Sequence, residues 1–103
     1  MTDSSTLDVM LTRDERIELL QAAADPVRWA VLEEIADTTK CVCDIRQGVP
    51  VPANLLSYHL KVLRDAGLVT ATRRGRWIDY TVASDAHDRL RAALPGTALA
   101  VAP

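Results

Sequence analysis

At Gly67 the spacing of apolar residues changes from the period of a helix to the period of a strand. Three leucines before it recur at the three- and four-residue steps of one helix face, namely Leu56, Leu60 and Leu63. Two runs after it place β-branched or aromatic residues at alternate positions, namely LVTATRR at 68–74 and RWIDYTV at 76–82. Glycine favours the end of a helix because it takes the left-handed conformation without a steric penalty. The sequence therefore predicts a helix over 52–67 and then a β-hairpin that turns around Arg74-Gly75.

Start signals for two further helices lie upstream. Thr12 and Glu15 have the spacing of a capping box, in which each side chain binds the backbone N–H of the other residue. This predicts a first helix with one face formed by Ile17, Leu20 and Ala24. Asp25 and Pro26 come next, and these residue types favour the cap and the first position of a helix. A second helix is expected from there through Ala36, with an apolar stripe of Val27, Trp29, Val31, Leu32 and Ile35.

Glycine and proline residues bound the remaining helices. A short helix over about 41–47 is expected to stop at Gly48, because the Val-Pro-Val-Pro segment that follows excludes a helix until Pro52. A last helix is expected over 84–94, where a Pro-Gly pair ends it. The predicted fold class is mostly α with a β-hairpin, in the order α-α-α-α-β-β-α.

The length and composition exclude several classes of protein. The chain has 103 residues, which predicts a single domain over 1–103 with flexible termini at 1–11 and 96–103. No run approaches the ~20 apolar residues of a membrane span, and the N-terminus lacks a secretory signal, so we expect no membrane and a cytoplasmic location. The four glycines form no phosphate-binding loop, and no nucleophile has a recognisable base beside it. These features argue against an enzyme.

Charge is distributed unevenly along the chain. The net charge is −2, yet residues 1–39 sum to −6, residues 40–82 to +4 and residues 83–103 to zero. A basic segment in an acidic protein is the pattern to test for a polyanionic partner, although ordinary variation of surface charge explains it equally well.

A helix, a tight turn, a second helix and a basic hairpin together predict a winged helix-turn-helix that binds double-stranded DNA. The helix over 52–67 then reads the major groove with side chains that face away from its leucines, and the hairpin tip reaches the DNA backbone or minor groove. We predict DNA contacts from Asn54, Ser57, Tyr58 and Lys61 on the helix and from Arg73, Arg74 and Arg76 on the hairpin. The alternative is an amphipathic core helix followed by a solvated turn.

Four segments resemble one family of proteins, the ArsR/SmtB winged-helix repressors. They are ADPVRWAVL at 24–32, CVCDI at 41–45, SYHLKVLRDAGLV at 57–69 and RRGRWIDYTV at 73–82. The resemblance extends from about Leu19 to Leu94 and implies a bacterial metal sensor that releases operator DNA when loaded. It also implies a homodimer that pairs through its first and last helices, with residues around 13–24 and 84–94 at the interface.

The two cysteines of the chain, Cys41 and Cys43, form a C-x-C pair. In a reducing compartment such a pair favours a ligand or redox role over a disulfide, and thiolates suit thiophilic ions. Side chains two residues apart on a regular helix lie ~200° apart around its axis, so one small ion cannot join both while the turn stays helical. We therefore expect ion capture to distort the first turn of the short helix, and with it the DNA-reading helix behind it.

The choice of ion depends on departures from the family pattern. Arsenic-sensing members commonly carry a third cysteine where this chain has Arg46, and residues 1–12 offer none. Cadmium and lead generally take three or four soft donors, so the resemblance favours arsenite, As(III), or antimonite, Sb(III), as the inducer. Cadmium, lead, zinc and nickel remain alternatives, as do a sensor of thiol oxidation, a metal-independent repressor and a protein-interaction module.

The remaining candidate ligands are weaker. Asp85 and His87 match half of the family's second metal site, but the positions of the other half are Ala98 and Val101, which cannot bind metal. We interpret Asp85 and His87 as a capping or surface pair. His59 has no suitably spaced cysteine or carboxylate, which favours a structural or phosphate-binding role.

Overall fold

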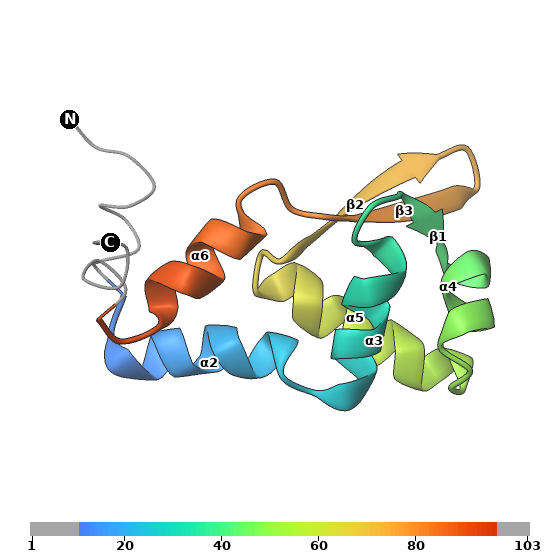
Figure 1. Ribbon diagram of the computed structural model, residues 1–103. Helices are drawn as coiled ribbons and strands as arrows, with labels where there is room; N and C mark the ends of the chain where they lie inside the picture. The colour runs from blue at the N-terminus through green and yellow to red at the C-terminus, as the bar shows by residue number, and fades with distance from the viewer. Residues whose placement is uncertain (1–10, 97–103) are drawn as a thin grey trace.

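The computed structural model describes residues 11–96, which form five helices and a three-stranded sheet (Figure 1). The order α-α-α-α-β-β-α predicted from the sequence is confirmed, with one short strand added before the third helix. The elements are α2 (Arg13–Ala23), α3 (Pro26–Ile35), β1 (Lys40–Cys41), α4 (Val42–Gly48), α5 (Ala53–Asp65), β2 (Val69–Arg74), β3 (Trp77–Val82) and α6 (Ala86–Ala93). Most of the predicted flexible termini, together with Ala98 and Val101, lie outside the described residues.

Both predicted N-terminal caps are present. The backbone N–H of Glu15 donates to Oγ1 of Thr12 at 3.1 Å, and that of Thr12 donates to Oε1 of Glu15 at 2.9 Å, which completes the capping box of α2. Oδ1 of Asp25 accepts from the N–H groups of Val27 at 2.8 Å and Arg28 at 3.1 Å. These bonds satisfy donors that the first turn of a helix leaves without partners.

The core joins all five helices to the base of the hairpin. Its most deeply buried side chains come from α3, α4, α5 and the start of the hairpin: Val31, Ile35, Ile45, Leu56, Leu60, Leu63 and Leu68. The leucine face of α5 predicted from the sequence is therefore confirmed. Together these side chains form one apolar cluster around α5, the recognition helix predicted from the sequence.

Two expected apolar faces differ from the observed ones. On α2 the buried residues are Leu19, Ala22 and Ala23, whereas Ile17 is 45% exposed. On α3 the stripe of Val31 and Ile35 is buried, but Trp29 is 56% exposed. Periodicity alone identifies apolar faces, and it does not say which of them the neighbouring elements cover.

The helix α5 ends just before Gly67, as the sequence predicts. Gly67 has φ +77°, and the N–H of Leu68 donates to the carbonyl of Leu63 at 3.0 Å, a bond typical of a glycine-capped helix end. Nη1 of Arg89 in α6 donates to the carbonyls of Ala66 and Gly67, both at 3.1 Å. The chain then passes directly into β2, so the recognition helix and the hairpin are held at a short, capped junction.

The strand β1 was not predicted. The sheet order is β1-β3-β2, with both pairs antiparallel, and Cys41 lies opposite Asp79 across the β1–β3 pair. In the β2–β3 hairpin, Thr72 lies opposite Asp79 and Arg74 opposite Trp77. Figure 1 shows β1 beside β3 near α4, at the end of the molecule away from α2 and α6.

Candidate metal centre and nucleic-acid interface

The cysteine pair lies at the junction of β1 and α4. Cys41 is the second residue of β1 and the N-cap of α4, with φ −82° and ψ 168°, and Cys43 lies in the first turn of α4. Both thiols are free, Cys41 half-buried and Cys43 exposed. The side chain of Cys41 makes no capping hydrogen bond, so no helix N–H competes with a ligand for its sulfur.

This position corrects part of the sequence interpretation. We expected both cysteines on the helix, but Cys41 has extended backbone and belongs to a strand. The ~200° separation of two helical positions therefore does not apply to the pair. In addition, α4 packs mainly on α3, β1 and β3, and it is α3 that has the broader contact with α5. The short helix and α5 also share one apolar core, to which Ile45 of α4 and the leucines of α5 belong.

The donor set around the pair is small. No group of three or more His, Cys, Asp or Glu side chains suited to one metal ion occurs within residues 11–96. A shallow hollow of about 350 Å³ is lined by Cys43, Arg46, Gln47, Pro50, Val51 and Pro52. Pro52 is the N-cap of α5, so this hollow lies between the cysteine helix and the start of the recognition helix.

The four side chains predicted to read DNA are all exposed on α5: Asn54, Ser57, Tyr58 and Lys61. They face away from the buried leucines, as the helical spacing requires. Nζ of Lys61 forms an ion pair with Asp65 at 2.7 Å, and both side chains are more than 60% exposed. Such an exposed pair is weak, about 0.3–0.5 kcal/mol, and leaves Lys61 available to another anion.

The three arginines of the hairpin differ in their partners. Arg73 donates to the carbonyl of Gly75 at 3.3 Å, and Arg76 is exposed beside the same turn. Arg74 donates to both carboxylate oxygens of Asp79, from Nε at 2.7 Å and from Nη2 at 3.2 Å. This hydrogen bonding lowers the pKa of Asp79 and raises the pKa of Arg74.

Arg64 is a basic residue that the sequence analysis did not assign to the interface. With Arg73 it lines a hollow of about 470 Å³ between α5 and the hairpin, together with Val69, Thr70, Ala71 and Ile78. Arg64 makes no ion pair with any residue in the 11–96 range. Ser57, Lys61 and Arg64 are four and three residues apart, which places them on one helix face. This spacing could have assigned Arg64 to the interface from the sequence.

His59 is a buried structural residue. Its ring is 6% exposed, and Nη1 of Arg28 lies 2.9 Å from Nδ1. Because a guanidinium only donates, Nδ1 accepts and the proton of the neutral ring lies on Nε2. Arg28 also donates to the carbonyls of Ala22 at 2.6 Å and Gln21 at 3.3 Å. His59 therefore helps to tie the end of α2 to the recognition helix.

Asp85 and His87 are both exposed at the start of α6. Asp85 occupies the N-cap position, but its side chain makes no capping hydrogen bond. Of the two interpretations from the sequence, the surface pair fits this geometry better than the cap.

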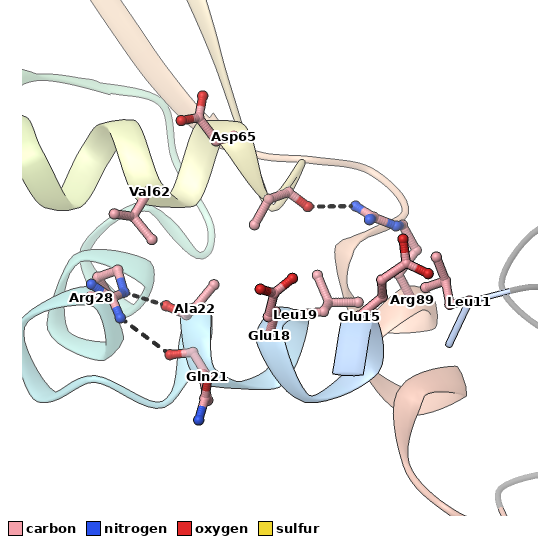
Figure 2. Close-up of a pocket in the computed structure, with 11 residues that line it drawn as sticks. Leu11, Glu15, Glu18, Leu19, Gln21, Ala22, Arg28, Val62, Asp65 and Arg89 are labelled. Atoms are coloured by element: carbon pink, nitrogen blue, oxygen red, sulfur yellow. Dashed lines mark hydrogen bonds between the residues drawn. The ribbon is translucent and has the colours of Figure 1, made fainter. Parts of the chain in front are cut away.

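A further hollow of about 530 Å³ lies between α2, the end of α5 and α6 (Figure 2). Figure 2 shows Arg28 bonded to the carbonyls of Ala22 and Gln21, and Arg89 bonded at the end of α5. Three acidic residues also line it: Glu15, Glu18 and Asp65. The guanidiniums that face this hollow are thus already engaged by helix ends.

In the 11–96 range, no helix is long and apolar enough to cross a membrane.

The comparisons with known proteins agree with this geometry. The family model described as "Bacterial regulatory protein, arsR family" matches residues 25–71. The transcriptional repressor SmtB of Mycobacterium tuberculosis is 42% identical over 66 residues, which cover 64% of this chain and 49% of that protein. The arsenical resistance operon repressor of Bacillus subtilis is 41% identical over 61 residues, 58% of each chain. This chain therefore spans about half the length of these curated relatives.

One solved structure supports the same family at the level of the fold. The crystal structure of a possible transcriptional regulator for arsenical resistance matches with a TM-score of 0.68 and 31% identity. The match covers 73% of this chain and 78% of the other.

Proposed function

Because this chain belongs to the ArsR family of bacterial regulatory proteins, we propose that it is a transcriptional repressor rather than an enzyme. It binds operator DNA as a homodimer and releases it when Cys41 and Cys43 bind As(III) or Sb(III). The observation that carries this proposal is the position of the two free thiols, one in the sheet of the hairpin and the other in the helix-turn-helix. A ligand held by both sulfurs joins the strand that pairs with the hairpin to the first helix of the helix-turn-helix.

The DNA interface is formed by the exposed face of α5 and by the hairpin. Asn54, Ser57 and Tyr58 lie in the first half of α5, the part that enters the major groove in helix-turn-helix proteins. Amide and hydroxyl groups there can bind base edges, and Lys61 supplies a phosphate contact. The exposed hairpin arginines, Arg73, Arg74 and Arg76, reach the DNA backbone or minor groove.

The dimer interface is formed by α2 and α6. These helices pack on each other at the end of the molecule opposite the cysteine pair (Figure 1). Ile17 on α2 and Leu94 just after α6 are 45% and 48% exposed, which is unfavourable for large apolar side chains in water. A two-fold interface covers both and presents two copies of α5 to half-sites about one helical turn of DNA apart.

The donor set fits a trivalent metalloid better than a divalent metal. The described residues offer two thiols and no third soft donor, whereas structural zinc sites take four ligands. Arsenite supplies an arsenic centre that exchanges hydroxide ligands for thiolate sulfur. For each cysteine the S–H proton leaves with one hydroxide as water while an S–As bond replaces an As–O bond, without oxidation or reduction. Arg46, next to Cys43 in the lining of the hollow, contributes no soft donor.

Cys41 and Cys43 are held by different elements. Cys41 is held by pairing with β3, and Cys43 by the first turn of α4. A ligand that bonds to both sulfurs fixes these two elements relative to each other, and we propose that this changes the β1–α4 junction. A ligand that binds this changed junction more tightly than the DNA-bound form weakens DNA binding by some factor. By linkage, DNA weakens the binding of the ligand by the same factor.

The test is DNA retention by wild type, by the single variants Cys41→Ser and Cys43→Ser and by the double variant, against a panel of arsenite, antimonite, cadmium, lead, zinc and nickel. We expect all four proteins to bind the operator, and only wild type to release it with arsenite or antimonite. Release of the double serine variant at the wild-type arsenite concentration contradicts the proposal. Release by peroxide without any ion identifies a thiol-oxidation sensor instead.

A further inference from the structure

The strand β1 connects the cysteine pair to the hairpin directly. Cys41 lies opposite Asp79 and Lys40 opposite Tyr80, so β1 pairs with β3. β3 is the second strand of the β2–β3 hairpin, which is the wing of this fold. The strand has only two residues, and α4 begins at the next position. A displacement of Cys41 therefore acts on β3 without passing through α4, α3 or α5.

Cys41 shares one face of this sheet with Asp79 and with residues of β2. Residues directly opposite on antiparallel strands point to the same face, with Cβ atoms about 4.5–5.5 Å apart, which places Cys41 beside Asp79. Thr72 is opposite Asp79 on the other side, and Arg74 is two residues beyond Thr72, so it also points to this face. The order across the sheet is thus Cys41, Asp79, Arg74.

The link between Asp79 and Arg74 is specific in its geometry. The carboxylate accepts two hydrogen bonds from one guanidinium, at 2.7 and 3.2 Å, and its side chain is only 17% exposed. A bidentate pair fixes the plane of the guanidinium as well as its position. The Asp79 hydrogen bond, and then its charge, raises the pKa of Arg74, and Cys41 and Asp44 act weakly in the same direction.

We propose that Asp79 is a positioning residue that couples the Cys41 strand to Arg74, so that ligand capture at the cysteine pair changes the DNA contact of the wing. This inference rests on the proposed function and names its regulation. Asp79 acts through its two hydrogen bonds with Arg74. It holds Arg74 at an angle set by β3, and β3 in turn is held by β1.

The alternative route runs from α4 through α3 to the recognition helix, because α3 packs on both. The two routes make different predictions for one substitution. Asp79→Asn removes the charge that holds Arg74, and it leaves the thiols and the leucine core of α5 unchanged. If the wing carries the coupling, this variant binds the ligand but releases DNA poorly. If α3 carries it alone, the variant releases DNA as wild type does.

Asp65→Asn is a matched control. It also removes one negative charge and frees one cation, Lys61, whose Nζ is 2.7 Å from the carboxylate. Asp65 is the last residue of α5 and has no pairing with β1. Both variants therefore lose one negative charge near the DNA-binding surface. They differ because Asp79 pairs with Cys41 across the sheet and Asp65 does not.

The experiment measures operator affinity with and without saturating arsenite for wild type, Asp79→Asn and Asp65→Asn. Allosteric coupling typically changes affinity about 5- to 150-fold, and we expect wild type and Asp65→Asn to fall in this range and to agree within about twofold. For Asp79→Asn we expect the ratio to fall below about threefold, with the same arsenite protection of both thiols from alkylation. Without arsenite, removal of the Asp79 charge that partly neutralises Arg74 should steepen the salt dependence of binding, by less than about one phosphate contact, an effect that loss of structure does not produce.

The outcomes separate the two proposals. If wild type and Asp79→Asn lose affinity by the same factor, the wing does not carry the coupling, and the proposed function stands. If wild type itself does not respond to arsenite, the proposed function fails, and this inference fails with it. Arg74→Gln removes the other end of the pair and should lower the ratio in the same way. A wild-type ratio in Arg74→Gln overturns the inference even where Asp79→Asn fails to fold.

Discussion

The turn that ends α5 allows a quantitative test of how the recognition helix is joined to α6. Gly67 has φ +77°, a left-handed conformation that costs an alanine about 1–2 kcal/mol. A Cβ at this position would lie 2.6 Å from Nη1 of Arg89, which donates to the carbonyls of Ala66 and Gly67. Because this atom is the end of a flexible side chain, we expect Arg89 to swing away and lose both bonds while the turn keeps its shape.

Gly67→Ala should therefore cost more than its backbone conformation alone. A hydrogen bond from a charged group contributes about 1.5–3 kcal/mol, and we take the lower end for the pair because Arg89 is only partly buried. The expected loss in the free energy of unfolding is then about 2.5–3.5 kcal/mol. Gly75 is a matched control, since it has φ +64° and no atom within 4 Å of the added Cβ. Gly75→Ala should lose only about 1–2 kcal/mol.

Urea unfolding followed by tryptophan fluorescence and circular dichroism measures both losses, at one fixed protein concentration because the stability of a dimer depends on it. A double variant of Gly67→Ala with Arg89→Ala provides a second check. The bonds of Arg89 can be lost only once, so the double variant should be about 1.5 kcal/mol more stable than the sum of the single losses predicts. Equal losses for Gly67→Ala and Gly75→Ala, or additive losses in the double variant, would refute the role assigned to Arg89.

Two other substitutions test the caps and the basic surface. The backbone N–H of Arg28 lowers the pKa of Asp25 below 3.8. The charge of Asp25 therefore stabilises the fold at pH values above the pKa that Asp25 has in the unfolded chain, and this contribution is lost as pH falls through its pKa in the folded protein. Asp25→Asn should thus be about 0.5 kcal/mol less stable at neutral pH and equal to wild type in acid, by thermal unfolding. Arg64→Gln should lower the salt slope of DNA binding by about 1 on cognate and random DNA, and Arg91→Gln, paired with Asp88 on α6, should leave it unchanged. An unchanged slope for Arg64→Gln would exclude its phosphate contact.

The elements predicted correctly from the sequence are those with local signals. The capping box of Thr12 and Glu15, the cap at Asp25 and the left-handed Gly67 each act within a few residues of chain. Their hydrogen-bond partners are already near in sequence, so residue type and spacing suffice to locate the helix ends. The leucine face of α5 follows for a similar reason, because its helical period is the same in any fold.

The candidate site was only partly visible in this way. The sequence located both cysteines and the exposed face of α5, but it placed Cys41 in a helix and missed Arg64. It also left His59 open between two roles, and the contact with Arg28 shows that the ring is part of the core. In each case the missing information was the partner, which lies on another element.

Local chemistry along the chain was therefore enough to place the helices and the hairpin of this protein. Folding added the pairing of Cys41 with Asp79, the contact of Asp79 with Arg74 and the exposure of Ile17 at the end of the molecule. The pairing of Cys41 with Asp79 joins segments that are remote in sequence, and strand register and helix packing bring them together only when the whole core forms. The connection between cysteine pair and wing belongs to this second class, which is why no motif in the sequence indicated it.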